Sequence, residues 1–264
     1  MSLNGKFKSF VKIMLLPFVA GCLLSVNFIK TDIDTEISLI SVFCGCIFQN
    51  PLNIGKLIKA FSPVILFAVL FGSYIYSDLT KSGIYSVVRY KNRVMFLIKK
   101  FLKLFACAVI YSAFFILAVV ISISPEKLDV SCICIIAVAF YNLVMTCIML
   151  SLFINLISLF IGETNGFTAG ISVFAFLCIE SLINKVTSFR KFSVYKLNPI
   201  RNYIINWHDW ELLKGNQMWE MGAVKDFTIR FSVGYFLFVV AILIAVLMFT
   251  VIRYDIAVSV KEEM

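Results

Sequence analysis

Six long runs of apolar residues follow one another along the chain, and each is bounded by charged or turn residues. A helix needs about 20 apolar residues to cross the hydrocarbon core of a bilayer, and runs of this kind predict spanning helices. We therefore expect an all-α, polytopic membrane protein with six transmembrane helices, in a single domain over residues 1–264. The expected spans are about Ile13–Ile29, Phe61–Ser77, Leu104–Ile123, Val130–Ile161, Phe167–Ile183 and Phe231–Ile252.

Two apolar stretches depart from the usual length of a span. Val130–Ile161 is 32 residues long, more than one bilayer thickness, so it must tilt, kink or begin in the interface. Ile37–Phe48 holds only 12 residues and predicts a half-inserted or interfacial piece.

The distribution of Lys and Arg predicts which loops face the cytoplasm, because basic loops are retained there. The first twelve residues carry three Lys and no acid, and residues 78–103 carry seven basic residues against one acid. Residues 31–55 carry three acids and no Lys or Arg. An even number of spans then places both termini in the cytoplasm of a multi-pass protein of the cytoplasmic membrane. Residues 184–230 fall outside, although they hold eight basic residues against four acids, and long translocated loops follow the charge rule poorly.

All three tryptophans of the chain fall in this outer loop, at Trp207, Trp210 and Trp219. Tryptophan prefers the interface between membrane and water. We expect two short interfacial or re-entrant helices that meet near Lys214–Asn216 and cap the outer end of the bundle.

The composition excludes a water-soluble enzyme of ordinary type. Hydrophobic residues make up 61% of the chain and charged residues only 15%, against about 25% charged in soluble domains. The net charge is +9, and the basic residues cluster at the ends of apolar runs. The expected anionic partners are therefore lipid headgroups and acidic protein surfaces, and not nucleic acid.

Motifs for catalysis are missing from the sequence. Gly55-Lys56 is followed by leucine and has Asn50 where a phosphate-binding loop needs its first glycine. The cysteines lack zinc-site spacing, and the single histidine, His208, is expected to be an interfacial polar residue. Val19–Cys22 has the form of a lipoprotein cleavage box, but the apolar run continues after the cysteine. We expect no catalytic residue, no metal and no cofactor on this chain.

The segment Ser77–Arg93 has the most informative pattern. Its apolar residues Ile84, Val87 and Val88 share one helical face, and its polar and basic residues lie around another. This predicts a short amphipathic helix at the membrane surface. The helix is explained either by anchoring to anionic lipid or by docking to a partner.

The order of features in this segment resembles one loop of a known family. A span that ends in Asp is followed by a Ser-Gly break, a short helix, an Arg-rich turn and then Lys99-Lys100. That loop is the one between the second and third spans of permease subunits in type-2 ATP-binding-cassette (ABC) exporters. The basic start Gly5–Lys12 is similar to that family's amphipathic interfacial helix, and the turn Gly162–Gly166 falls at its second, smaller ATPase contact. The resemblance implies a cytoplasmic coupling helix between spans 2 and 3 and outer re-entrant helices between spans 5 and 6.

The same resemblance implies an export permease without enzymatic activity. ATP and Mg would bind to separate ABC ATPase subunits, and a second permease copy or a related permease would complete the pathway. The implied ATPase-coupling residues are Asp78, Lys81, Ser82, Gly83, Tyr85, Arg89, Arg93, Glu163 and Thr164.

The cargo is expected to be apolar or amphipathic, because the spans hold few charges. By analogy with the family, the expected cargo is an antimicrobial or toxin-like peptide. Glu180 is the one acid well inside a span, and it either lines the pathway or a subunit interface or reaches the membrane surface. Together with the three tryptophans it forms the candidate pathway set. The alternatives are a non-transporting membrane protein, such as an assembly factor or sensor partner, and a secondary transporter.

Overall fold

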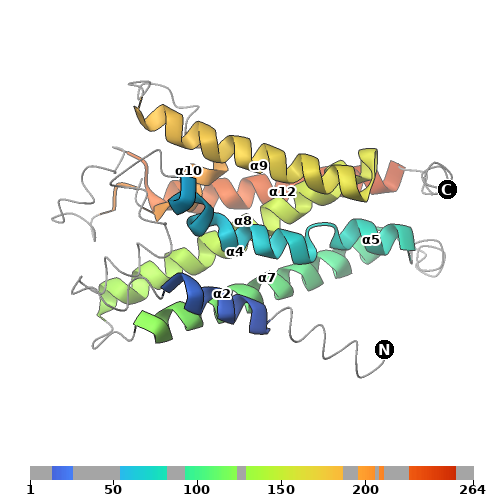
Figure 1. The fold of residues 1–264 in the computed structure, drawn as a ribbon. Coiled ribbons are helices and arrows are strands. Elements are labelled where there is room, and N and C mark those ends of the chain that lie inside the picture. Colours follow the sequence, from blue (N-terminus) through green and yellow to red (C-terminus); the bar gives the residue numbers. More distant parts are fainter. Residues whose placement is uncertain are drawn as a thin grey trace.

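The computed structural model describes residues 14–25, 54–81, 93–123, 129–186, 196–205, 208–210 and 226–253, and all of its regular elements are helices (Figure 1). The long helices run roughly along one direction and form a bundle. In chain order the helices are α2 (Leu16–Ser25), α4 (Ile54–Phe71), α5 (Tyr74–Lys81), α7 (Arg93–Ile123), α8 (Val130–Ile161), α9 (Glu163–Val186), α10 (Pro199–Tyr203) and α12 (Ile229–Arg253).

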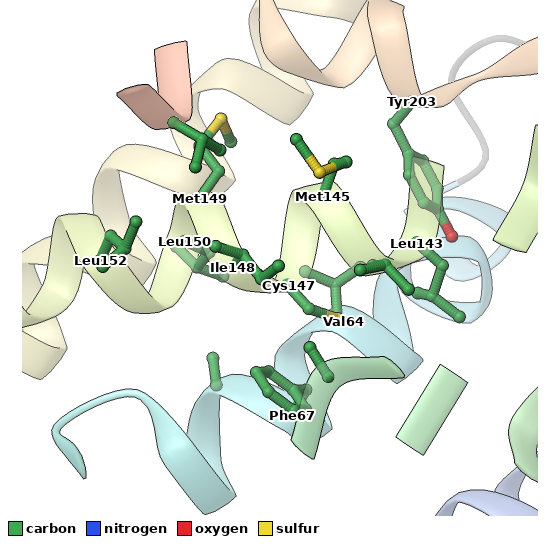
Figure 2. Close-up of a cluster of buried hydrophobic side chains, with 14 of the residues drawn as sticks. Val64, Phe67, Leu143, Met145, Cys147, Ile148, Met149, Leu150, Leu152 and Tyr203 are labelled. Carbon is green, nitrogen blue, oxygen red and sulfur yellow. The ribbon is translucent and has the colours of Figure 1, made fainter. Parts of the chain in front are cut away.

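Helix α8 is the centre of the bundle. It contacts α4, α5, α7, α9, α10 and α12, and every residue from Asn142 to Leu152 is buried. Figure 2 shows this stretch with Val64 and Phe67 of α4 packed against it. Helix α8, which at 32 residues is unusually long for a span, is therefore the helix that most of the others pack against.

Glycines allow α9 to lie very close to α8. A Cβ built at Gly170 would meet the Ile154 Cγ1 atom at 2.5 Å, and one built at Gly166 would meet the Ser158 nitrogen at 2.6 Å. Small residues at a four-residue spacing let two helix backbones approach in this way. Gly162 alone separates the two helices and has φ 84°, a conformation that suits glycine. The five-residue turn expected at Gly162–Gly166 is therefore wrong, because α9 already begins at Glu163.

The second predicted span is broken. Helix α4 ends at Phe71, a turn follows at Gly72 and Ser73, and α5 begins at Tyr74. The apolar run Phe61–Ser77 does not show this break, because the stretch Ala60–Thr80 as a whole is still apolar enough for a span.

Among the described residues, four helical stretches are long and apolar enough to cross a membrane: Ala60–Thr80, Val94–Ile123, Val130–Ile161 and Ile229–Arg253. By helix length and hydropathy the chain is thus a multi-pass membrane protein. Helix α9 has 24 residues but opens with the polar sequence Glu-Thr-Asn-Gly and also contains Glu180. The described part of the first predicted span, α2, has 10 residues. The four stretches therefore do not include the first and fifth predicted spans.

Several predicted boundaries move outward in the structure. The fourth span is confirmed at Val130–Ile161, and the sixth becomes Ile229–Arg253. Helix α7 begins at Arg93, 11 residues before the predicted start at Leu104, and has 31 residues. The reason is that Lys99, Lys100 and Lys103 lie inside the helix. Their charged side chains end the apolar run, but lysine does not end a helix. The predicted pieces at Gly5–Lys12 and Ile37–Phe48 lie outside the described residues.

Candidate functional sites at the two ends of the bundle

The ends of the helices gather at two opposite ends of the bundle (Figure 1). One end holds α5, the start of α7, the turn between α8 and α9, and the end of α12. We call this the α5 end. The other holds α10 and the start of α12, and we call it the α10 end.

At the α5 end, a single side chain spans the break between α4 and α5. The Asn155 amide nitrogen donates to the Gly72 carbonyl at 2.6 Å and to the Ser151 carbonyl at 2.7 Å. Its amide oxygen accepts from the Tyr76 backbone N–H at 2.8 Å. In an unbroken helix the Gly72 carbonyl and the Tyr76 N–H would bond to one another. The Asn155 amide, which is fully buried, thus replaces this one missing backbone hydrogen bond.

Two further polar contacts bind the broken segment to its neighbours. The Ser73 hydroxyl donates to Glu163 Oε1 at 2.7 Å, which joins the break to the first residue of α9. Asp78 pairs with Lys100 of α7. Contacts from three other helices, α7, α8 and α9, therefore hold the segment Ser73–Lys81, so a displacement of α5 would act on all three.

Basic and aromatic side chains surround this ion pair. The Lys100 ammonium lies 5.5 Å from the centre of the Tyr74 ring and 5.2 Å from that of Phe96, and the Lys103 ammonium lies 5.2 Å from the centre of Tyr74. Cation–π attraction of this kind is worth about 0.5–1 kcal/mol at exposed sites. It keeps the two lysines folded back along the end of the bundle.

The predicted coupling residues are placed as follows. Asp78 lies in α5, and Glu163 and Thr164 lie in the first turn of α9, where Thr164 is exposed. Lys81 is the last residue of α5 and Arg93 the first of α7, although neither side chain is described. Ser82, Gly83, Tyr85 and Arg89 lie outside the described residues. Asp78 is therefore part of the broken segment, and Glu163 contacts that segment through Ser73.

The α10 end is filled by a short segment that enters the bundle. All five residues of α10 are buried, and the Tyr203 ring packs against Phe61 of α4 with centroids 5.2 Å apart. Asn142 of α8 donates to the Tyr203 carbonyl at 3.2 Å. Proline at the first helical position and Asn198 as N-cap begin this helix. Residues 198–205 of the predicted outer loop are thus buried among the long helices.

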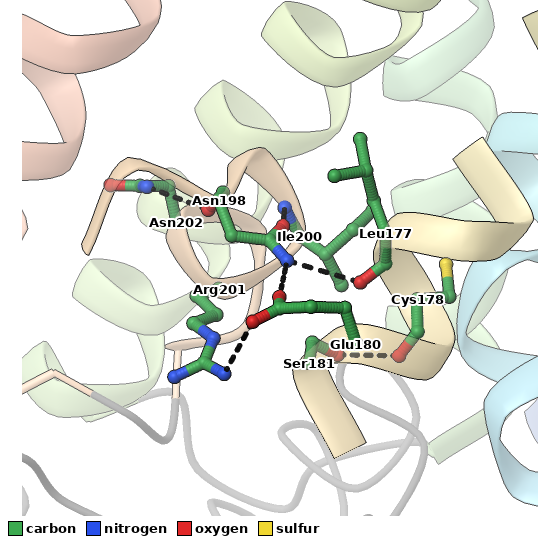
Figure 3. A network of polar contacts seen from close by, with 8 residues as sticks. All are labelled: Leu177, Cys178, Glu180, Ser181, Asn198, Ile200, Arg201 and Asn202. Atoms are coloured by element: carbon green, nitrogen blue, oxygen red, sulfur yellow. Dashed lines mark hydrogen bonds and ion pairs between the residues drawn. The ribbon is translucent and has the colours of Figure 1, made fainter. Parts of the chain in front are cut away.

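Glu180 is bound within its own chain at this end (Figure 3). Its Oε1 atom lies 3.4 Å from Nη2 of Arg201, and its Oε2 atom accepts a hydrogen bond from the Asn198 amide. The Asn198 amide also donates to the Leu177 carbonyl at 3.1 Å. The Arg201 side chain is only 2% exposed and that of Glu180 is 31% exposed. Glu180 therefore serves to hold α10 against α9.

The remaining residues of the candidate pathway set are only partly placed. Trp210 is half-buried against the core. Trp207, Trp219 and the expected meeting point Lys214–Asn216 lie outside the described residues. His208, expected at the interface, is instead buried and bonded to Ser232 of α12.

Sequence patterns alone did not identify Asn155, Arg201, Asn202 and Ser232, which make the main polar contacts between helices. A buried amide in an apolar run is a weak signal that each such residue has a partner elsewhere, but it does not say where. Within the described ranges, no three His, Cys, Asp or Glu side chains lie close enough together to hold a metal ion.

Comparisons with known proteins identify no relative of this chain. No family model, no curated protein and no solved structure matches the chain.

Proposed function

We propose that the chain is the transmembrane permease subunit of an ABC exporter, powered by ATPase subunits on separate chains. The observation that carries the proposal is the arrangement at the α5 end. The segment expected to precede a coupling helix is anchored to α7 through Asp78 and Lys100, to α8 through Asn155, and to α9 through Ser73 and Glu163. A transporter driven by a partner needs such a connection between its docking surface and its core.

In the proposed arrangement the chain has six spans, with α2 and α9 as parts of the first and fifth. Both termini and the α5 end face the cytoplasm, and the α10 end faces outward. A second copy or a related permease completes the pathway. This arrangement is supported by the Lys and Arg distribution and by the position of both expected ATPase contacts, Asp78 and Glu163, at one end of the bundle.

The proposed cargo is apolar or amphipathic, with an antimicrobial or toxin-like peptide as the leading candidate. Glu180, the acid inside a predicted span, is paired with Arg201 of the same chain. Since that carboxylate already has a basic partner, it offers little to an ion, and the exposed surfaces of the long helices are largely apolar. ATP-dependent uptake of a fluorescent amphipathic peptide into inside-out vesicles tests the cargo class.

Co-expression with an ABC ATPase subunit encoded in the same genome tests the partnership. We expect the two chains to purify together in stoichiometric amounts and to hydrolyse ATP. The double variant Arg89→Glu and Arg93→Glu should lower ATPase recovery about tenfold, because a basic surface facing an acidic partner loses attraction and gains repulsion.

The matched control is Arg253→Glu, a charge reversal at the end of α12, which lies at the same end of the bundle. It should leave ATPase recovery unchanged. Equal recovery of ATPase with the wild type and the double variant would leave lipid anchoring as the role of the basic loop. Complete absence of ATPase from the purified protein would favour a non-transporting membrane protein.

A further inference from the structure

His208 lies at a junction between two segments at the α10 end. Its side chain is buried, its ring stacks on Phe227 with centroids 4.5 Å apart, and the ring planes differ by 15°. Nδ1 lies 3.0 Å from the Ile205 carbonyl oxygen, and Nε2 lies 2.6 Å from the Ser232 hydroxyl oxygen. Both ring nitrogens are therefore within hydrogen-bonding distance of protein oxygens.

The chain of contacts continues from Ser232 to Asn202. The Asn202 amide nitrogen donates to the carbonyls of Lys196 at 2.8 Å and Asn198 at 2.9 Å (Figure 3 shows the second). Because carbonyls only accept, these two bonds fix the orientation of the amide. Its oxygen therefore faces the Ser232 hydroxyl, 2.7 Å away, and can only accept from it.

With a neutral imidazole, this chain of contacts has one hydrogen too few. The Ile205 carbonyl requires a hydrogen on Nδ1, so a neutral imidazole bonded to it has no hydrogen on Nε2. Ser232 has one hydroxyl hydrogen, and both His208 Nε2 and Asn202 Oδ1 are placed to accept it. With a neutral ring, one of these two short contacts joins two acceptors. An imidazolium removes the conflict, since Nε2–H donates to Ser232 and Ser232 donates to Asn202.

We propose that His208 is a buried proton-binding site in which the Ser232 hydroxyl acts as a two-way switch. With a neutral ring, Ser232 donates to His208 Nε2. When a proton from solvent binds to the lone pair of Nε2, the new N–H donates to Ser232, and the serine hydrogen rotates to Asn202 Oδ1. No covalent bond between heavy atoms forms or breaks, and the ring keeps its place between the 208–210 segment and α12.

The described elements that adjoin the site carry both acids and bases. They come from α9, from the segments 196–205, 208–210 and 226–228, and from α12: Glu180, Asp209 and Asp226 as acids, and Lys196, Arg201 and Arg230 as bases. None of these charges is among the causes that shift the pKa of His208. The hydrogen-bond partners and the burial of the ring therefore decide where the site titrates.

The pKa of His208 is lowered from 6.5 to about 4, chiefly by burial, and this value already includes the opposing effect of hydrogen bonds to the Ile205 and Ile204 backbone. The Ser232 and Asn202 acceptors further favour the charged ring, and so does the face of Phe227. We therefore expect a midpoint between about 4 and 6.5. The ring is neutral at pH 7 and gains its proton as the pH falls. This site depends on the fold of the bundle and not on the chain being a permease.

His208 is the only histidine in the sequence, so histidine-selective ¹⁵N labelling yields one pair of ring signals for the whole protein. We expect both ring nitrogens to carry hydrogen at low pH, with the midpoint in the stated range. Ser232→Ala should lower the midpoint by about 1 pH unit, because the charged ring loses its acceptor. Ser158→Ala is the control, since that buried hydroxyl bonds only within α8, to the Ile154 carbonyl, and it should leave the midpoint unchanged.

A second readout is the apparent melting temperature between pH 7 and pH 5. A folded-state pKa below that of the unfolded chain means that stability is complete above about pH 6.5 and falls as the pH drops. The decrease should be larger in Ser232→Ala than in the wild type. A ring that stays neutral down to pH 4 in the folded protein would overturn the proposal, as would a midpoint at the ordinary value of 6.5. So would a midpoint that Ser232→Ala leaves unchanged.

Discussion

Replacing Asn155 with leucine removes the amide that spans the break between α4 and α5 and keeps the number and branching of side-chain heavy atoms. Three hydrogen bonds disappear, to the Gly72 carbonyl, the Ser151 carbonyl and the Tyr76 N–H. The Ser151 carbonyl keeps its backbone donor within α8, because it lies inside that helix. The Gly72 carbonyl and the Tyr76 N–H lose the partner that replaces their own mutual bond.

The expected cost follows from these two groups. A buried polar group that loses its partner costs about 1–3 kcal/mol, and hydrogen bonds between transmembrane helices average about 0.6 kcal/mol and reach about 1.7 kcal/mol. Two groups at an intermediate value give a loss of about 2–4 kcal/mol. For a protein of this size, that loss lowers the melting temperature by about 5–15 °C.

Thermal melting of the purified protein in detergent, followed by size-exclusion chromatography, measures this change. Ser151→Ala is the matched control, because Ser151 lies one turn earlier on the same buried face and its hydroxyl makes no hydrogen bond with a described residue. It should shift the melting temperature by less than about 2 °C. If Asn155→Leu has the same melting temperature as the wild type, the amide does not stabilise the break between α4 and α5. The proposed transmission from α5 to α8 then loses its main contact.

Three further predictions concern other parts of the bundle. Gly170→Ala should cost about 1–3 kcal/mol of stability because it overpacks the α8–α9 contact, whereas Gly234→Ala on α12, where an added Cβ meets nothing within 4 Å, should be neutral in the same melting assay. A cysteine at Leu197, which is 55% exposed, should react with an impermeant maleimide from outside intact cells, and reaction only after permeabilisation would reverse the proposed topology. In a double-mutant cycle, Glu180→Ala and Arg201→Ala together should cost about 1–3 kcal/mol less than the sum of the single variants, and strict additivity would show that the pair is not coupled.

The apolar runs by themselves determined that the chain is helical and crosses the membrane more than once. Hydropathy is a local and additive property, so a run such as Val130–Ile161 is recognisable without knowledge of its neighbours, and its boundaries are those of α8. Local signals also explain the start of α10, where Asn198 and Pro199 form an N-cap and a first helical residue.

Only the tertiary structure decided where the polar residues inside these runs find their partners. Asn155 lies 83 positions after Gly72 in the chain, and Glu180 lies 21 positions before Arg201. Nothing in the residues around either one indicates such a partner. A buried polar group must be satisfied, but any of several helices could satisfy it. The break between α4 and α5, the buried α10 segment and the His208 contacts all arise from these long-range pairings, which exist only once the helices have packed.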